Sequence, residues 1–135
     1  MLQLEHSEDI HLETIRVVNK MEEMKLSKAS LTLVRIAPRK VRLVLDLIRG
    51  KDLKEAEAIL LNVNRGAGRV IYKVVESAKA NAVHNFNMDV DKLYVYETYA
   101  NEGPTLKRMQ PHAKGQGFPI LKRTSKIYVS LAEKE

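Results

Sequence analysis

The stretch from Glu102 to Lys126 constrains this 135-residue chain most strongly, because it has too few apolar residues to form a core of its own. It carries six lysines and arginines against one acid, a net charge of +5 in a chain whose total is +6. Two basic pairs, Lys107-Arg108 and Lys122-Arg123, flank a centre that contains glycines and prolines. Because chain reversals select these two residue types, the spacing predicts a β-ribbon folded back on itself.

Such a ribbon is unstable alone. Two arms of about a dozen residues, at roughly 3.3 Å per residue, extend on the order of 40 Å. A lone hairpin of this length is marginal in water, so we expect a partner outside the chain to stabilise it. The charge of the stretch and the pI near 9.5 favour a polyanion, with nucleic acid the first candidate and an anionic membrane surface the second.

The composition argues against other classes of function. The chain has no cysteine, which removes disulfides, cysteine-based zinc sites and thiol catalysis. Its four histidines lack metal-ligand spacing, and the fragments Gly66-Ala67-Gly68 and Gly115-Gln116-Gly117 lack the third glycine of a nucleotide-binding loop. No apolar run approaches a membrane span and no signal peptide is visible. We expect a soluble cytoplasmic protein, not an enzyme, that needs no metal or cofactor.

The remaining sequence predicts alternating strand and helix patterns. Apolar residues alternate in three segments and recur at helical spacing in three others. In chain order we expect a strand over Ala29–Ile36, helices beginning at Pro38, at a capping box of Asp52 and Glu55, and near Ala67, and strands over Lys92–Ala100 and Ile127–Leu131. In the second strand, Leu93, Val95 and Glu97 should share one face. This order predicts an α+β fold in which three helices cover a three-stranded antiparallel sheet and the ribbon continues the last two strands as a long protruding β-hairpin.

The first 28 residues differ in charge from the others. They hold six acids and four bases, a net charge of −2, which leaves +8 for residues 29–135. Leu12, Ile15, Val18 and Met21 recur every three residues after a possible helix start at Ser7–Asp9, so a short amphipathic helix and a solvated leader are both open interpretations. We therefore expect one domain over residues 29–132, preceded by an acidic extension and followed by a short tail.

An exposed line of arginines is expected on the first helix. Arg39, Arg42 and Arg49 share this line with Asp46. A merely solvated face is the alternative, but arginine favours phosphate contact because its planar fork can donate two hydrogen bonds to one phosphate.

Several longer motifs resemble one known family. IAPRKVRLVLDLIRGK at Ile36–Lys51, ESAKANAVHN at Glu76–Asn85, and EGPTLKRMQPHAKGQG with ILKRTSKIYV after Glu102 closely resemble the large-ribosomal-subunit protein twenty-two family, over roughly residues 29–132. The resemblance implies helices on a three-stranded sheet with a long hairpin. It also implies that the body binds large-subunit ribosomal RNA and that the hairpin tip helps line the tunnel of the nascent peptide.

The resemblance assigns site residues position by position. With Arg49 added from the arginine line, the RNA-binding set is Arg39, Lys40, Arg42, Arg49, Lys107, Arg108, Lys114, Lys122, Arg123 and Lys126. The tunnel-lining tip comprises Pro111, His112, Ala113, Lys114, Gly115, Gln116, Gly117 and Phe118. His112 and Gln116 stand where the family often has arginine, which reduces the expected phosphate contacts at the tip. The acidic extension lies outside the family pattern.

The expected partners are ribosomal RNA, neighbouring ribosomal proteins and the nascent polypeptide, without self-association. The competing interpretation is an architectural DNA-binding dimer whose ribbon enters the minor groove. Tyr94, Tyr96, Tyr99 and Tyr128 lie on predicted strands, where packing within the sheet is favoured over stacking on bases.

Overall fold

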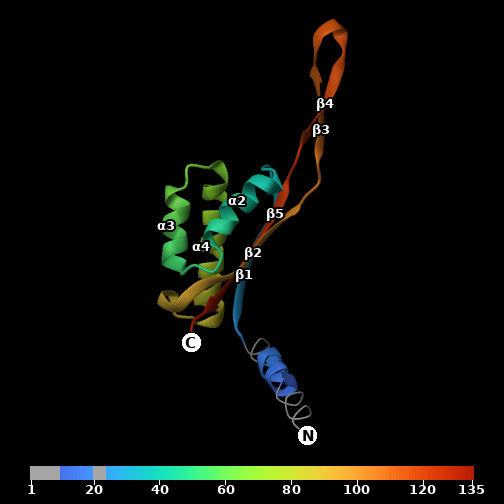
Figure 1. Ribbon diagram of the computed structural model, residues 1–135. Coiled ribbons are helices and arrows are strands. Elements are labelled where there is room, and N and C mark those ends of the chain that lie inside the picture. Colours follow the sequence, from blue (N-terminus) through green and yellow to red (C-terminus); the bar gives the residue numbers. More distant parts are fainter. Residues whose placement is uncertain (1–9, 20–23) are drawn as a thin grey trace.

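The structure, a computed structural model, describes residues 10–19 and 24–135 and confirms the α+β class (Figure 1). A sheet with the strand order β1-β5-β2, antiparallel throughout, carries three helices, and β3 and β4 form a separate two-stranded ladder. The elements are β1 (Leu26–Val34), α2 (Pro38–Ile48), α3 (Leu53–Asn62), α4 (Gly66–Phe86), η1 (Val90–Lys92), β2 (Leu93–Glu102), β3 (Leu106–Pro111), η2 (Ala113–Gly115), β4 (Gly117–Lys122) and β5 (Ser125–Glu133).

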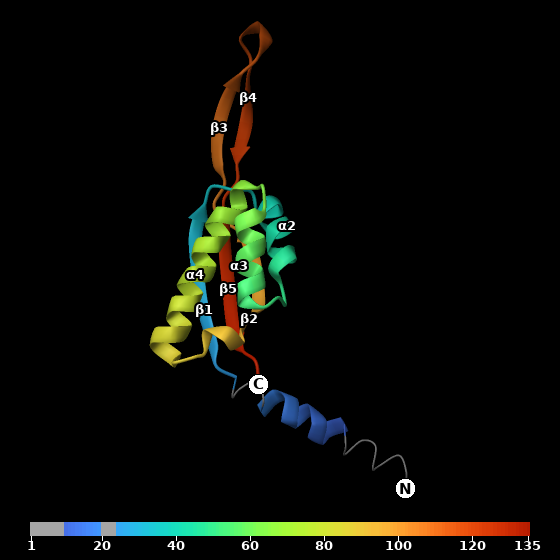
Figure 2. The same cartoon turned by 90° about the vertical axis from the view of Figure 1, so that its left-hand side faces the viewer.

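All three helices pack on one face of the sheet (Figure 2). Their apolar stripes meet the inward side chains of the strands in a single buried cluster that includes Leu45, Ile71 and Leu131. Helix α4 places the small residues Ala78 and Ala82 against β1, where both are fully buried. The close approach is fixed by the hydroxyl of Ser27, which donates to the carbonyl of Ala78 at 2.6 Å.

Helix boundaries follow the sequence closely, with one difference in capping. Pro38 occupies the first turn of α2, as expected of a residue whose missing N–H costs nothing there. Asp52 is the N-cap residue of α3, but its side chain makes no capping hydrogen bond. The carboxylate of Asp52 pairs instead with Lys134 at the end of the chain. The predicted capping box is therefore wrong in its bonding.

The strand boundaries differ more. β1 starts at Leu26 and ends at Val34, earlier at both ends than the prediction. The ladder with β5 is irregular between Leu31 and Val34, and Leu33 has a left-handed φ of 60°. As a consequence Val34 is buried while Leu33 is exposed, so the alternation expected here changes phase.

A second irregularity changes the phase of β2. Val95 pairs with Leu131 and Glu97 pairs with Ser130, so β2 advances two residues while β5 advances one. Such a bulge reverses which side chains face the core. Leu93 and Val95 are buried as predicted, but Glu97 is exposed and Thr98 lies against the helices. The prediction that Glu97 shares a face with Leu93 and Val95 is therefore wrong.

The acidic extension contributes a helix. Residues 10–19 are helical and every side chain on them is exposed, including Ile10 and Leu12 (Figure 1). This range has no buried face, so it does not distinguish an amphipathic helix from a solvated leader, and Ser7–Asp9 and Met21 lie outside the described residues.

Candidate nucleic-acid interface

The hairpin of β3 and β4 protrudes beyond the body (Figures 1 and 2). Its register runs from Leu106 opposite Lys122 to Pro111 opposite Gly117. None of its residues joins the buried core, and Met109 and Phe118 are 71% and 50% exposed. The prediction of a ribbon without an interior is confirmed. Its length is corrected, because Glu102 and Lys126, expected on the ribbon, belong to the sheet of the body.

A narrow junction joins the hairpin to the body. We call it the waist, residues 103–105 and 123–124, where the strand ladder is interrupted. The amide of Gly103 donates to the carbonyl of Thr124 at 2.9 Å, and the buried hydroxyl of Thr124 donates to the carbonyl of Pro104 at 2.6 Å. Gly103 is required here by space, because a Cβ atom on it would lie 2.4 Å from the Thr124 hydroxyl. These two hydrogen bonds cross the junction between the chain entering the hairpin and the chain leaving it.

A cationic hollow lies beside the waist. We call it the notch: a hollow of about 430 Å³ lined by Arg35, Ala37, Lys40, Leu106, Arg108, Leu121, Lys122, Arg123 and Thr124. Five of these residues are cations and none is an acid. The hydroxyl of Ser125 donates to the carbonyl of Ile36 at 2.8 Å, which holds the turn before α2 against β5. Convergent lysines and arginines of this kind suit the phosphates of a nucleic acid.

The notch brings together only part of the predicted RNA-binding set. It is lined by Lys40 of α2, by Arg108 and Lys122 of the two hairpin arms, and by Arg123 of the waist. Sequence reasoning missed Arg35, which lay within the predicted strand Ala29–Ile36 and gave no signal that the hairpin root would lie beside it. The other predicted cations lie elsewhere: Arg39 and Arg42 on α2, Arg49 at its C-cap, Lys107 on the hairpin arm, Lys114 at the tip and Lys126 on β5.

Arg42 of α2 and Arg49 at its C-cap bind the open edge of β2. Both nitrogens Nε and Nη2 of Arg42 donate to the carbonyl of Ala100, at 3.1 and 3.0 Å. Arg49 donates to the carbonyl of Thr98 at 3.0 Å and pairs with Asp46 at 2.7 Å. The expected exposure of this arginine line is confirmed, and its guanidinium groups also satisfy the acceptors of an edge strand. Because a guanidinium has five N–H donors, each keeps donors for a phosphate.

Replacing Arg42 by methionine should lower the free energy of unfolding by about 1–3 kcal/mol, because the Ala100 carbonyl loses a charged donor. Urea unfolding would measure the change, with Arg39→Met as the matched control on the same exposed line. Equal midpoints for the two variants would show that the edge contact contributes nothing.

The tip closes as a short structured turn. The amide of His112 donates to the carbonyl of Gln116 at 2.7 Å, and Lys114 and Gly115 have left-handed φ values of 63° and 69°. The ring of His112 meets that of Phe118 edge to face at 4.6 Å. All side chains from residue 111 to residue 118 are exposed, so the tip presents a small, weakly charged surface.

Residues 10–19 and 24–135 offer neither a metal centre nor a membrane-spanning helix. No group of three or more histidines and acids is placed to hold a metal ion. No helix in these ranges is long and apolar enough to cross a membrane.

Comparison with known proteins adds independent information. Residues 29–132 match the family model described as "Ribosomal protein L22p/L17e". The chain is 61% identical over 102 residues to "Large ribosomal subunit protein uL22" of Acholeplasma laidlawii (strain PG-8A), covering 76% of this chain and 92% of the relative. It is 56% identical over 109 residues to the protein of that name from Macrococcus caseolyticus (strain JCSC5402), covering 81% and 88%. The Lactobacillus gasseri protein of the same name is 53% identical over 113 residues, covering 84% and 97%.

Proposed function

Because the chain belongs to the ribosomal protein L22p/L17e family, we propose that its hairpin and notch bind large-subunit ribosomal RNA and that its tip lines the tunnel of the nascent peptide. The protein is a structural constituent of the large ribosomal subunit, located in the ribosome in the cytoplasm, and it is not an enzyme. Family membership disfavours the alternative of a DNA-bending dimer.

The observation that carries RNA binding is the notch at the root of a hairpin without a core. Five cations from three parts of the chain converge there, and no acid lines the notch. Without a bound anion these cations would repel one another. Phosphates would neutralise them and release counterions, and this release supplies affinity. Shape would supply specificity, since the major groove of A-form RNA is too narrow for side chains to read.

Ordering of the hairpin completes the proposed mechanism. The arms present backbone ladders and exposed cations on both faces, because Lys107 and Arg108 alternate in direction along β3. RNA helices on either side would contact both faces at once. These contacts would hold the hairpin in one direction. The tip would then reach the wall of the peptide tunnel, at a distance from the body.

The tunnel assignment is tested with a stalled nascent chain that carries a photoreactive side chain at successive positions. We expect the nascent chain to cross-link to residues 111–118 of this protein only within a limited range of nascent-chain lengths, because the tip occupies one depth in the tunnel. Peptides of α3, on the helix-covered side of the body, serve as the control. Cross-links to other tunnel components at every length, with none to the tip, would contradict the assignment.

A further inference from the structure

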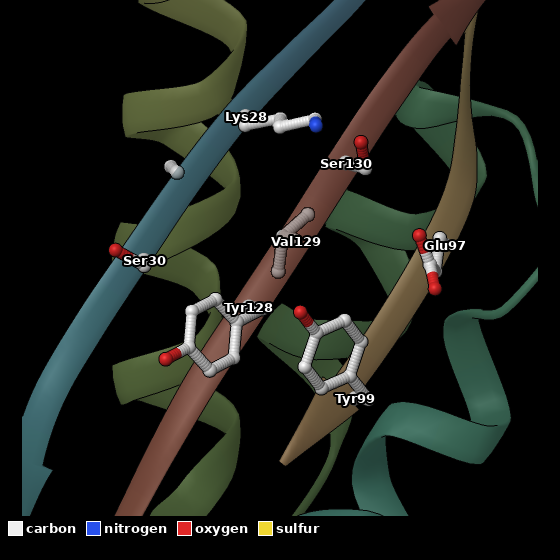
Figure 3. A pocket seen from close by; sticks show the side chains of 8 residues that line it. Lys28, Ser30, Glu97, Tyr99, Tyr128, Val129 and Ser130 are labelled. Atoms are coloured by element: carbon white, nitrogen blue, oxygen red, sulfur yellow. The ribbon is translucent and has the colours of Figure 1, made fainter. Parts of the chain in front are cut away.

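The face of the sheet opposite the helices has a hollow of about 300 Å³ that the proposed interface does not use. Figure 3 shows this face, with the helices behind the strands. The three strands place their outward side chains in two rows. One row consists of Lys28, Ser130 and Glu97, and the next of Ser30, Tyr128 and Tyr99.

The second row supplies an aromatic surface. The rings of Tyr99 and Tyr128 stack with their centroids 4.7 Å apart and their planes 22° apart (Figure 3). Tyr99 packs within the sheet, as expected, by stacking on the ring of the neighbouring strand, but it remains 41% exposed and so also presents an open ring surface. A preformed aromatic pair on a sheet, with the ring of Tyr99 exposed and that of Tyr128 half-buried, is a stacking platform for an unpaired nucleobase.

The first row supplies polar side chains that have no hydrogen-bond or ion-pair partner among the residues that the structure describes. Ser130 is only 6% exposed, and its hydroxyl has no hydrogen-bond partner among the described residues. A buried hydroxyl without a partner costs free energy that a ligand can recover. Lys28 and Glu97 flank Ser130 on the two neighbouring strands, and within residues 10–19 and 24–135 neither takes part in an ion pair.

We propose that this face binds one unpaired guanine nucleotide of the RNA, an inference that rests on the proposed function. The carboxylate of Glu97 only accepts hydrogen bonds and suits the donor groups on the pairing edge of guanine. Ser130 and Lys28 can donate to its O6 acceptor. The tyrosine pair stacks on the ring.

Continuity with the proposed interface favours RNA over a protein partner here. Asn101 and Lys126 form the next row along the same two strands, between the tyrosine pair and the waist. An RNA segment held at the notch would therefore pass Lys126 and then reach the stacked rings of Tyr99 and Tyr128. A guanine turned out of that segment fills the hollow.

The first test titrates the full chain with GMP, AMP, CMP, UMP and inorganic phosphate, with backbone amide NMR shifts as the readout. We expect saturable shifts at Glu97, Tyr99 and Ser130, with GMP binding about tenfold tighter than UMP. Glu97→Gln should remove this preference. Tyr99→Phe, which keeps the stack, should retain it, and unchanged spectra elsewhere will show that both variants fold.

Equal affinity for all four nucleotides, or the same shifts from inorganic phosphate alone, would overturn the guanine site. In assembled subunits, ultraviolet cross-linking should join Tyr99 or Tyr128 to a guanosine. Cross-linking of Lys28 to another protein, with no RNA adduct on either tyrosine, would instead show a protein-covered face. The salt dependence of RNA binding is measured separately. If RNA binding weakens steeply with salt but the four nucleotides bind equally, this inference is rejected and the proposed function stands.

Discussion

Raising monovalent salt from about 50 to 200 mM should weaken binding to folded large-subunit ribosomal RNA by about 10²- to 10⁵-fold. The expectation follows from six to nine cations of the hairpin, the notch and α2, each releasing about 0.7 to 0.9 counterion. The log–log slope of affinity against salt is then on the order of −4 to −8. Filter binding over a salt series measures it, and a slope near −1 would contradict charge neutralisation as the source of affinity.

A notch variant shows where this salt dependence originates. Changing Arg108, Lys122 and Arg123 together to glutamine should reduce the magnitude of the slope by about 2 to 3, because three phosphate contacts are lost. The matched control removes the same charge elsewhere, by changing Lys54, Lys79 and Lys134, which pair with acids of the body. Equal losses in the two variants would show that net charge alone governs binding.

The second large effect is expected at the waist, where Gly103→Ala should lower the free energy of unfolding by about 1–3 kcal/mol. The added Cβ would meet the Thr124 hydroxyl at 2.4 Å, and that hydroxyl cannot simply rotate away without losing its bond to Pro104. Thermal unfolding of the free protein measures the loss. RNA affinity should also fall, because the hairpin leaves the body in an altered direction.

A double-mutant cycle separates the steric conflict from general damage. Thr124→Ala alone should cost about 1 kcal/mol for the lost hydrogen bond. Combined with Gly103→Ala it should cost less than the sum of the two single changes, because the clashing oxygen is gone. Strict additivity would mean that Gly103 serves a purpose other than accommodating Thr124.

Sequence patterns predicted the helices well, but they predicted poorly which side chains of each strand face the core. Pro38 and the apolar spacing of α2 define that helix in the sequence itself, and the structure begins it at the same residue. The bulge after Val95 is different, because alternation in the sequence continues through it unchanged. Only pairing with β5 reveals that Glu97 leaves the core face.

The candidate site likewise has features that the sequence reveals and others that only the fold creates. The basic arms of the hairpin are evident from composition alone. The notch is not, since Arg35 and Arg123 are far apart in the sequence and meet only after the hairpin root packs beside α2. Likewise, the spacing of Arg42 and Arg49 predicts an exposed line, but their carbonyl partners lie about fifty residues away on β2.

The interrupted ladder at the waist has a mechanical consequence for assembly. A hairpin arm of six residues at roughly 3.3 Å each acts as a lever of about 20 Å, so rotation by about 10° at its root displaces the far end by about 3–4 Å. The pivot is crossed by the two hydrogen bonds of Gly103 and Thr124 rather than by a continuous sheet. If the hairpin binds RNA as proposed, we expect the body to dock first and the RNA groove that receives the hairpin to set its final angle.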